Sequence, residues 1–272
     1  MEEGWKLIVL GILQGVLEWL PVSSQGHLVL VMTYLLGIDS ADALGLSVYL
    51  HSGTLFAAAI YFRRDLLALF RTLRSYRLRR YRLRRSEQES RLTSFLLFTT
   101  VLTGIIGYLI YRLAEATGLL GEFFMASTGI ALVSTGLIQK LAKESAERSV
   151  NDLKLTDTLI LGVAQGLSAF PGISRSGITI SALLIRGFKG EAALKLSFLM
   201  SIPAVIVAEI GLASAASLSK IGMMDLLLGS AFSFLTGALS IHIFMKAARK
   251  IRFWSLCVLI GILALLPSLG YL

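Results

Sequence analysis

The fold of this chain is decided by a hydrophobic stretch that occurs twice and is broken each time by polar residues. Residues 10–27 read LGILQGVLEWLPVSSQGH, and residues 161–177 read LGVAQGLSAFPGISRSG. The Leu-Gly-x-x-Gln-Gly openings align, and Ser24 and Ser174 each stand three residues after a proline. Broken apolar helices at corresponding positions of two repeats are typical of a site near the middle of a bilayer. The breaks carry a carboxylate, an imidazole, a guanidinium and several hydroxyls, which favours catalysis or ion handling.

The composition and the charge-free windows indicate an integral membrane protein. The 272 residues are 55% hydrophobic and only 16% charged, and their mean hydropathy is +0.75. A run of roughly 17–25 apolar residues crosses a hydrocarbon core of about 30 Å, and it does so as a helix because backbone groups in lipid must be paired internally. We predict one span at 196–217. Five further windows lack acidic and basic residues: Ala43–Phe62, Leu92–Tyr111, Phe123–Gln139, Leu226–Met245 and Phe253–Leu272.

The net charge of +9 reflects the two sides of a membrane rather than a nucleic-acid surface. Eleven arginines fall between Arg63 and Arg91, in what we expect to be a loop joining two spans. Basic residues gathered in one loop form the positive-inside pattern and favour contact with anionic lipid headgroups. We therefore expect membrane lipids as partners and no nucleic acid. The single cysteine, Cys257, lies in the last span and cannot form an internal disulfide.

The interrupted stretches are too short to cross the membrane as continuous helices. Leu7–Leu20 and Leu28–Gly37 flank a break that contains proline and glycine, so we expect residues 5–37 to form a hairpin that enters the membrane and returns. Residues 156–187 form a second hairpin by the same argument. Placing the basic loops in the cytoplasm puts both termini outside, and the two hairpins then enter from opposite faces.

These assignments predict an all-α integral membrane protein of the plasma membrane, with six transmembrane helices and two re-entrant helix hairpins. The chain forms a single membrane domain, residues 1–272, built as an inverted-topology repeat. The first repeat covers about 1–150 and the second about 151–272.

Both hairpin tips place serines directly before a short helix. The free N–H groups and the positive dipole end of such a helix form an anion site, especially for phosphate. Capping is the more common role for any one of these hydroxyls. Each tip offers two candidate caps for its helix: Ser23 or Ser24 for a helix beginning near His27, and Ser174 or Ser176 for one beginning near Ile178.

Arg175 and Glu18 are the charged residues of the two tips. A guanidinium between apolar segments is expensive without an anionic partner, and its planar fork suits the oxygens of a phosphate. The simpler alternative is a salt bridge from Arg175 to Glu18 that only joins the hairpins. Gln14 and Glu18 stand four residues apart on one helical face, so their oxygens can converge on a hard divalent cation. Glu18 acting as a general base is also open.

Two histidines lie where they could take part in this chemistry. His27 follows Ser24 by three residues, within reach of activating a hydroxyl or protonating a leaving oxygen. His51 stands in the middle of a predicted span, in the run VYLHSGT (48–54). It either lines the same cavity or hydrogen-bonds across helices, and the second role is at least as common.

Two motifs resemble those of the undecaprenyl-diphosphatase family of bacitracin-resistance membrane phosphatases. Gln14-x-x-x-Glu18 followed by PVSSQGH (21–27) is similar to that family's acidic motif and its Pro-Val-Ser-Ser-x-Gly-His run. PGISRSG (171–177) with Thr179 is similar to its Pro-Gly-x-Ser-Arg-Ser-Gly-x-Thr signature. The order and spacing of these motifs cover the whole chain. Gln14 departs from the many members that carry glutamate there, and this removes one anionic metal ligand.

The resemblance implies hydrolysis of undecaprenyl diphosphate to undecaprenyl phosphate and inorganic phosphate. This reaction recycles the lipid carrier of cell-envelope glycan synthesis and confers resistance to bacitracin. A divalent cation, magnesium or calcium, would be held by Glu18 with help from Gln14. The catalytic candidates that match the family are Glu18, Ser24, His27 and Arg175. The candidates for binding the polyprenyl diphosphate are Ser23, Gly26, Ser174, Ser176, Gly177 and Thr179.

The resemblance leaves two assignments of the nucleophile. Ser24 is preferred, with His27 as its base, and direct attack by His27 is the rival. Arg175 would hold the phosphoryl oxygens as charge develops on them.

A polyprenyl-phosphate flippase or transporter is the main alternative, because inverted repeats with broken helices also serve alternating access. Transport needs Arg175 but neither a nucleophile nor a base, so the pair Ser24 and His27 favours the enzyme. A phosphatase of the phosphatidic-acid type would carry spaced lysine, arginine and histidine motifs, and the chain contains no such set. Whether two copies assemble as a homodimer is left open by the sequence.

Overall fold

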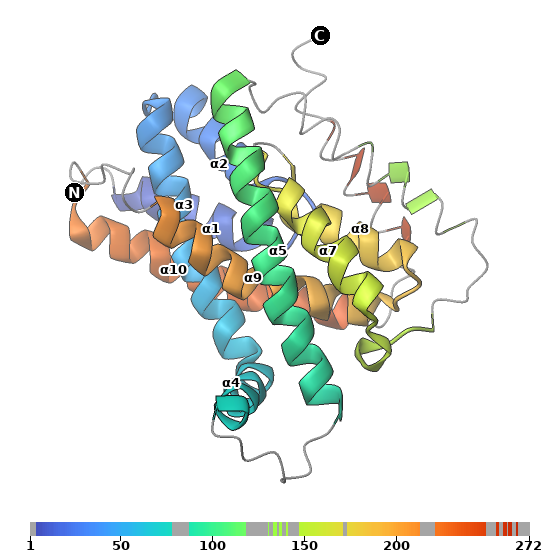
Figure 1. The fold of residues 1–272 in the computed structure, drawn as a ribbon. Helices are drawn as coiled ribbons and strands as arrows, with labels where there is room; N and C mark the ends of the chain where they lie inside the picture. Colours follow the sequence, from blue (N-terminus) through green and yellow to red (C-terminus); the bar gives the residue numbers. More distant parts are fainter. Residues whose placement is uncertain are drawn as a thin grey trace.

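A computed structural model describes residues 4–77, 87–117, 147–170, 173–212 and 221–248, together with isolated positions between 130 and 140 and between 254 and 265. Its regular structure in these residues is helical, apart from one isolated β-bridge between Arg148 and Phe188. Figure 1 shows the helices in chain order: α1 (Gly4–Leu17), α2 (Ser24–Leu30), a π-helical turn (Val31–Leu35), α3 (Ser40–Tyr61), α4 (Arg63–Arg77), α5 (Glu87–Thr117), a 3-10 turn (Val150–Asp152), α7 (Leu155–Leu167), α8 (Arg175–Ile185), α9 (Gly190–Leu212) and α10 (Met223–Ala247).

Both predicted hairpins are present as pairs of short helices joined by a tip. The first is α1–α2 and the second is α7–α8. The helices that follow the tips begin at Ser24 and Arg175, three residues earlier than the positions expected at His27 and Ile178. The reason is that the serine caps lie one residue before these starts, so the first helical turn already includes the polar residues of each tip.

The described helices include four of the six predicted spans. Three are long and apolar enough to cross a membrane: Gln88–Ile110, Gly190–Ile210 and Met223–Ala247. A fourth candidate combines Gly45–Tyr61 with Arg63–Arg74, which meet at a bend of 80°. The other two windows, Phe123–Gln139 and Phe253–Leu272, fall largely outside the residues that the structure describes.

The prediction of a loop over residues 63–91 is wrong for its described part. Arg63–Arg77 is the helix α4, and α5 already begins at Glu87. The arginines of α4 alternate with leucine and phenylalanine at helical spacing, and arginine is itself a good helix former, so a basic segment need not be irregular. The prediction gave weight to the high charge of this segment and overlooked the helical spacing of its apolar residues.

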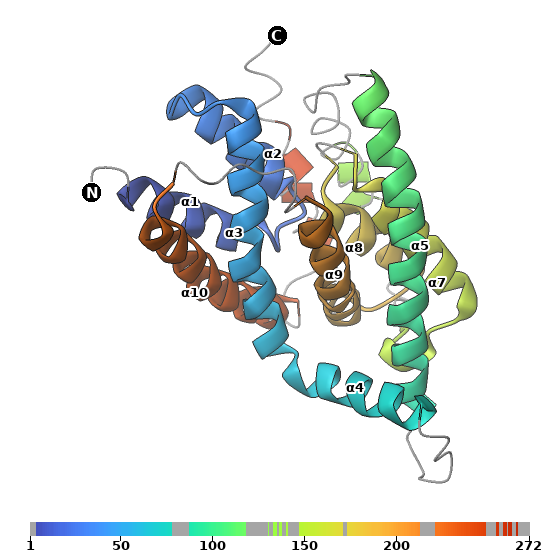
Figure 2. The same cartoon turned by 60° about the vertical axis from the view of Figure 1, so that its left-hand side comes forward.

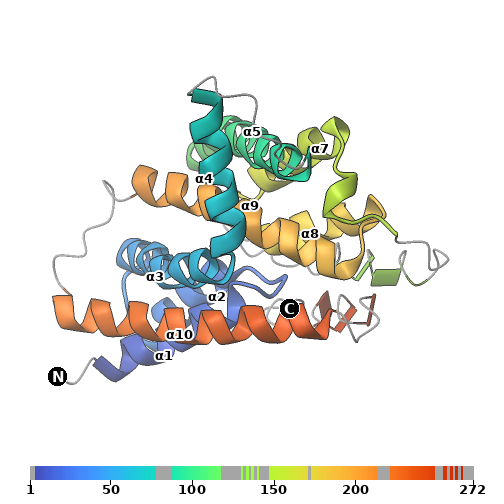
Figure 3. The same cartoon turned by 90° about the horizontal axis from the view of Figure 1, so that it is seen from below.

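The two hairpins pack reciprocally on the long helices. α1 lies along α10, and α7 lies along α5, as Figure 3 shows from below. Glycines allow both close approaches. A Cβ on Gly11 would lie 2.2 Å from the backbone oxygen of Gly229, and one on Gly166 would lie 2.7 Å from Cβ of Ile106. Small residues that let backbones approach are the usual basis of helix packing within membranes.

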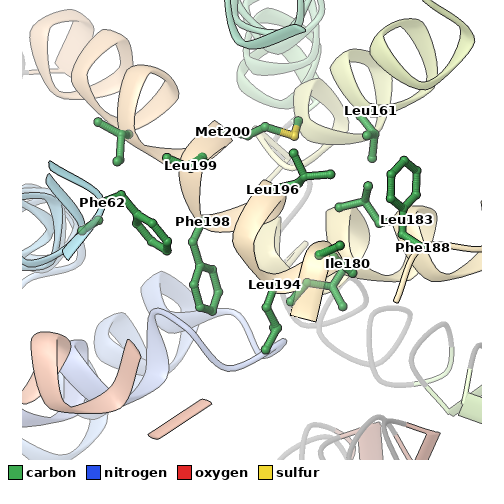
Figure 4. Close-up of a cluster of buried hydrophobic side chains, with 14 of the residues drawn as sticks. Phe62, Leu161, Ile180, Leu183, Phe188, Leu194, Leu196, Phe198, Leu199 and Met200 are labelled. Carbon is green, nitrogen blue, oxygen red and sulfur yellow. The ribbon is translucent and has the colours of Figure 1, made fainter. Parts of the chain in front are cut away.

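α9 lies at the centre of the largest hydrophobic cluster. Figure 4 shows its side chains meeting those of the neighbouring helices, with Phe198 and Met200 fully buried. Trp19, from the first hairpin tip, packs edge-on against Phe198 with ring centroids 4.9 Å apart. The cluster also includes Ile180 and Leu183 of α8. This central helix therefore holds both hairpin tips against one common surface.

Candidate active site

The carboxylate of Glu18, which follows the last turn of α1, is the point where the two hairpins meet. Glu18 is only 5% exposed. Its Oε2 accepts hydrogen bonds from Nε2 of Gln14 at 3.0 Å and from Oγ of Ser24 at 2.8 Å. Its Oε1 accepts from Nη2 of Arg175, which comes from the second hairpin 157 residues further along the chain. The predicted convergence of Glu18 with Gln14 and Arg175 is therefore present.

The two tips are built in the same way. The serines at equivalent positions, however, are not the two that each follow a proline by three residues. Ser23 caps α2 by accepting from the N–H of Gly26, and Ser174 caps α8 by accepting from the N–H of Gly177. Ser23 therefore corresponds to Ser174, and Ser24 corresponds to Arg175. Ser23 stands nine positions after Gln14, and Ser174 stands nine positions after Gln165. The prolines do not mark equivalent positions, because Pro21 follows Gln14 by seven positions and Pro171 follows Gln165 by six.

This correspondence places Ser24 and Arg175 at the same position, the first residue of a helix directly after its cap. Both side chains reach Glu18, one to each carboxylate oxygen. The site thus combines a hydroxyl and a guanidinium, presented from two equivalent frameworks, around a single buried carboxylate.

Direct contacts hold the two tips together. Oγ of Ser176 donates to the backbone oxygen of Leu20 at 2.7 Å. A Cβ on Gly177 would lie 3.3 Å from the backbone oxygen of Pro21, so the tips approach closely at this glycine. These contacts fix the distance across which Arg175 reaches Glu18.

The hydroxyls predicted to bind substrate already have partners within the protein. Ser174 accepts from Gly177 and is 3.2 Å from Oγ of Ser176. Thr179 is fully buried and is 2.7 Å from Oγ of Ser197 on α9, to which it joins α8. These hydroxyls therefore hold the backbone of the tip and its contact with α9. Arg175, which keeps an unpaired nitrogen, is the better candidate for contact with a ligand.

His27 lies one turn after Ser24 but makes no hydrogen bond to it among the described contacts. Its Nδ1 is 2.7 Å from the backbone oxygen of Ser23, so this nitrogen carries a proton and donates. In this tautomer Nε2 is the nitrogen that can accept a hydrogen bond. The hydroxyl of Ser24 donates to Glu18 instead.

His51 is a member of this site that the sequence did not assign to it. Its Nε2 is 3.1 Å from Oε2 of Glu18, and its Nδ1 is 2.7 Å from the backbone oxygen of Ser47. Both ring nitrogens therefore face oxygen acceptors, and His51 joins α3 to the carboxylate. The hydrogen bond across helices was one of the two roles open for His51. The signal that could have selected it is an ionisable residue in the middle of an apolar span.

Two buried polar atoms beside Glu18 have no hydrogen-bond partner among the described residues: Nη1 of Arg175 and Oε1 of Gln14. Burying an unpaired polar group costs roughly 1–3 kcal/mol, more for a charged one, which suggests that a ligand satisfies them. The guanidinium nitrogen offers a donor to an anion. The amide oxygen, next to a carboxylate, offers a donor atom to a hard cation.

The same atoms decide whether a divalent cation fits. Within the described residues, no group of three or more His, Cys, Asp or Glu side chains is arranged to hold a metal ion. A complete protein cage is therefore absent there. Magnesium, however, commonly takes only one or two protein oxygens and completes its shell with water and substrate phosphates. Glu18 with Oε1 of Gln14 matches that smaller requirement.

Comparisons with known proteins match this chain to one family over nearly its whole length. The family described as "Bacitracin resistance protein BacA" matches residues 7–266. A protein of Methanococcoides burtonii named "Undecaprenyl-diphosphatase" is 42% identical over 267 residues, covering 96% of this chain and 97% of its own. Proteins of the same name from Haloarcula marismortui and Methanothrix thermoacetophila are each 36% identical and cover 96% of this chain and 96% and 95% of their own.

Proposed function

The chain belongs to the family of the bacitracin resistance protein BacA, and from this membership we propose that it is an integral membrane undecaprenyl-diphosphatase whose active site lies at the two hairpin tips. It hydrolyses undecaprenyl diphosphate to undecaprenyl phosphate and inorganic phosphate, which recycles the lipid carrier of cell-envelope glycan synthesis and confers resistance to bacitracin. The polyprenyl-phosphate flippase gains no support from the relatives.

The observation that carries this assignment is the unpaired guanidinium nitrogen of Arg175 beside the hydroxyl of Ser24 and the carboxylate of Glu18. Arg175 keeps one nitrogen on Glu18 and offers the other to the terminal phosphate. The N-terminus of α8, whose first residue is Arg175, adds its dipole to the same anion. Charge that develops on the phosphoryl oxygens is thereby stabilised by groups already in place.

Ser24 is the nucleophile in this proposal. Its oxygen attacks the terminal phosphorus, the bond to the bridging oxygen breaks, and undecaprenyl phosphate leaves. Oε2 of Glu18, 2.8 Å from the hydroxyl, takes the serine proton. Water then attacks the phosphoserine, which releases inorganic phosphate and restores the hydroxyl.

His27 serves the second half of this reaction. With Nδ1 donating to the backbone of Ser23, its Nε2 is free to accept the proton of the attacking water. Base catalysis on Ser24 by His27, and direct attack by His27, are the competing assignments. They predict different covalent intermediates, because only direct attack by His27 forms a phosphohistidine.

A divalent cation, magnesium or calcium, belongs to the same proposal. Glu18 and Oε1 of Gln14 would hold it, and it would neutralise charge on the diphosphate when bound. The reciprocal contacts of α1 with α10 and of α7 with α5 support an inverted-topology repeat with re-entrant hairpins and six spans. Basic loops in the cytoplasm, both termini outside and polyprenyl diphosphate as substrate complete the proposal.

The test is phosphate release from undecaprenyl diphosphate by the purified protein in detergent, with magnesium and with EDTA. We expect release that requires the cation and that Arg175→Ala abolishes while the protein remains folded. Metal-dependent release that persists in Arg175→Ala would remove Arg175 from the mechanism. A complete lack of release by folded protein would overturn the phosphatase itself.

A further inference from the structure

α4 presents an outward surface that combines arginines with large apolar side chains. We define the outer face of α4 by the exposed residues that share one side of the helix, namely Arg63, Arg64, Leu67, Phe70, Arg71 and Arg74. Leu67 and Phe70 are 50% and 64% exposed, although both are large and apolar. The opposite side is occupied, since Leu66 and Leu69 pack against the main hydrophobic cluster.

The direction of α4 places this face at a membrane boundary. α3 is long and apolar, and α4 leaves its end at an angle of 80°. Figure 2 shows α4 running crosswise from the lower end of α3 toward that of α5. A helix perpendicular to a membrane-spanning neighbour lies along the membrane plane. Leu67 and Phe70 then reach toward the acyl chains while the arginines lie at the level of the headgroups.

The charge of this face has no counterpart within the described part of the chain. No carboxylate there forms a salt bridge with Arg63, Arg64, Arg71 or Arg74. Asp65, the acidic residue of α4, is on the other side of the helix and pairs with Lys195 at 2.8 Å. Four unneutralised guanidiniums on one helical face attract an anionic surface, and arginine binds phosphate oxygens in a bidentate manner.

A hollow at the elbow between α3 and α4 offers room for such a group. Its volume is about 490 Å³, and its lining combines aromatic and aliphatic side chains with three basic and two acidic ones, namely Arg63, Arg64, Lys195, Asp65 and Glu191. Asp65 is paired with Lys195, whereas Arg63 and Arg64 form no salt bridge among the described residues and stand beside the aromatic and aliphatic walls. This combination matches a phospholipid at the interface, where a phosphate stands directly above the first carbons of its chains.

From these observations we propose that the outer face of α4, with the adjoining hollow, is a binding site for anionic phospholipids of the leaflet on that side. Arg63, Arg64, Arg71 and Arg74 contact the phosphates, and Leu67 and Phe70 insert between the chains. Polar contacts of this kind with a charged headgroup distinguish the site from the lipid-facing sides of the spans, where apolar side chains meet any lipid alike.

The experiment uses the full chain carrying Phe70→Trp, reconstituted in vesicles of equal parts phosphatidylcholine and phosphatidylglycerol. Bromine atoms on the acyl chains of one lipid or the other quench tryptophan that touches that lipid. Emission from the native tryptophans is measured in the parent chain and subtracted. We expect quenching of the introduced tryptophan by brominated phosphatidylglycerol to exceed that by brominated phosphatidylcholine at least about twofold.

Three matched chains make the result decisive. Ile105→Trp probes α5 at a residue that is 57% exposed, within a stretch (101–109) that carries no charge, and we expect equal quenching by both lipids. Replacing the four arginines by glutamine in the Phe70→Trp chain should bring its ratio to that of Ile105→Trp. Replacing them by lysine should keep most of the preference, because the charge remains.

Equal quenching by the two lipids in the Phe70→Trp chain with all four arginines would overturn the proposal, and so would a preference that survives the glutamine replacement. Absence of quenching by either lipid would also overturn it, because α4 would then stand clear of the bilayer. The comparison of Phe70→Trp with Ile105→Trp decides the matter even if the glutamine variant fails to fold.

Discussion

The carboxylate of Glu18 accepts hydrogen bonds that come from four different segments: its own helix α1, the start of α2, α3 and the start of α8. A buried carboxylate needs this number of donors, because each of its oxygens loses water on burial. The arrangement also keeps Ser24 and Arg175 at a fixed distance from each other. In the proposed mechanism Glu18 therefore combines two functions: its donors satisfy a buried charge, and they align the nucleophile Ser24 with the anion-binding Arg175.

Replacing Arg175 by lysine separates these functions. A lysine can keep the ion pair with Glu18, but it offers no second, rigidly placed nitrogen to the phosphate. We expect kcat/KM for undecaprenyl diphosphate to fall about 100-fold while the folded protein persists. Arg91→Lys, at an exposed position of α5, is the control and should leave kcat/KM unchanged. Nearly full activity of Arg175→Lys would show that charge alone, rather than the second nitrogen, is required.

His51 is a positioning residue in this scheme, since it contacts Glu18 and not the phosphate. His51→Leu removes one hydrogen bond to Oε2 of Glu18, and we expect kcat to fall about tenfold or more with KM within about twofold of its original value. His51→Gln retains a donor and should recover most of kcat. A change confined to KM would instead place His51 in contact with substrate.

The sequence predicts the chemistry of these residues better than their pairing. Gln14, Glu18 and Arg175 could be selected because charged and amide groups are costly between apolar segments. The contact of His51 with Glu18 could not be predicted from the sequence. It joins residues 33 positions apart on different helices, and it depends on how those helices cross. The serine caps were narrowed to two candidates each, and only the backbone geometry distinguishes Ser23 from Ser24.

At the scale of elements, close helix crossings hold the hairpins in place. The Leu-Gly-x-x-Gln-Gly openings put glycines where α1 meets α10 and where α7 meets α5. The sequence therefore contains the signal for these contacts, although it does not say which helix is the partner. By contrast, α4 was mistaken for a loop because its charge outweighed its periodicity. Its Leu66 and Leu69 gain their role only by packing against the main cluster.

Gly15→Ala tests the crossing of α1 with α10. A Cβ there would lie 2.6 Å from the backbone nitrogen of Gly237, so the two helices would have to separate. We expect the free energy of unfolding to fall by about 1–3 kcal/mol, measured as a lower Tm in detergent. Gly104→Ala on α5, whose Cβ would meet nothing within 4 Å, is the control and should not lower Tm. Equal Tm values for both variants would argue against the tight crossing.

The base of the second hairpin is braced by Asp157, in the first turn of α7 and outside the candidate spans. Burial alone would raise the pKa of Asp157, but hydrogen bonds from Arg148 and Arg186 outweigh it and hold the pKa below the usual carboxyl value. A lowered pKa in the folded state means that the carboxylate stabilises the protein above the ordinary pKa. This stabilisation disappears as the pH falls through the lowered value.

Asp157→Asn should therefore lower the free energy of unfolding by about 2 kcal/mol at neutral pH, since two guanidiniums lose their charged acceptor. The difference in Tm between the two proteins should shrink as the pH is lowered from about 7 toward 3, because the native carboxylate is then protonated as well. A difference that stays constant over this range would mean that Asp157 acts through its shape and not its charge.

At the scale of the whole molecule, each half of the chain supplies what the other half needs. The first hairpin packs on α10 of the second half, and the second hairpin packs on α5 of the first half. The site itself takes Ser24 and Glu18 from one half and Arg175 from the other. The two polar tips could be predicted from the sequence, whereas this exchange of partners could not, because it requires the long-range contacts.

Expression of residues 1–146 and 147–272 as separate chains tests this dependence. We expect neither half alone to release phosphate from undecaprenyl diphosphate, and co-expression to restore metal-dependent release. Arg175→Ala in the second chain is the control for the restored activity. Activity of either half by itself would contradict a site assembled from both.

The equivalence of Ser24 with Arg175 bears on how such a molecule can arise from two copies of one segment. The position that corresponds to Glu18 in the second half is Ala169, so the duplicated frameworks differ at the very residues that meet. Two copies of the first tip would supply two carboxylates but no guanidinium, and two copies of the second would supply two guanidiniums but no carboxylate, so neither identical pair could form the ion pair of Glu18 with Arg175. An ancestor with identical halves therefore needed a different residue at one of these positions, and divergence of the copies was a condition for this chemistry rather than a later refinement.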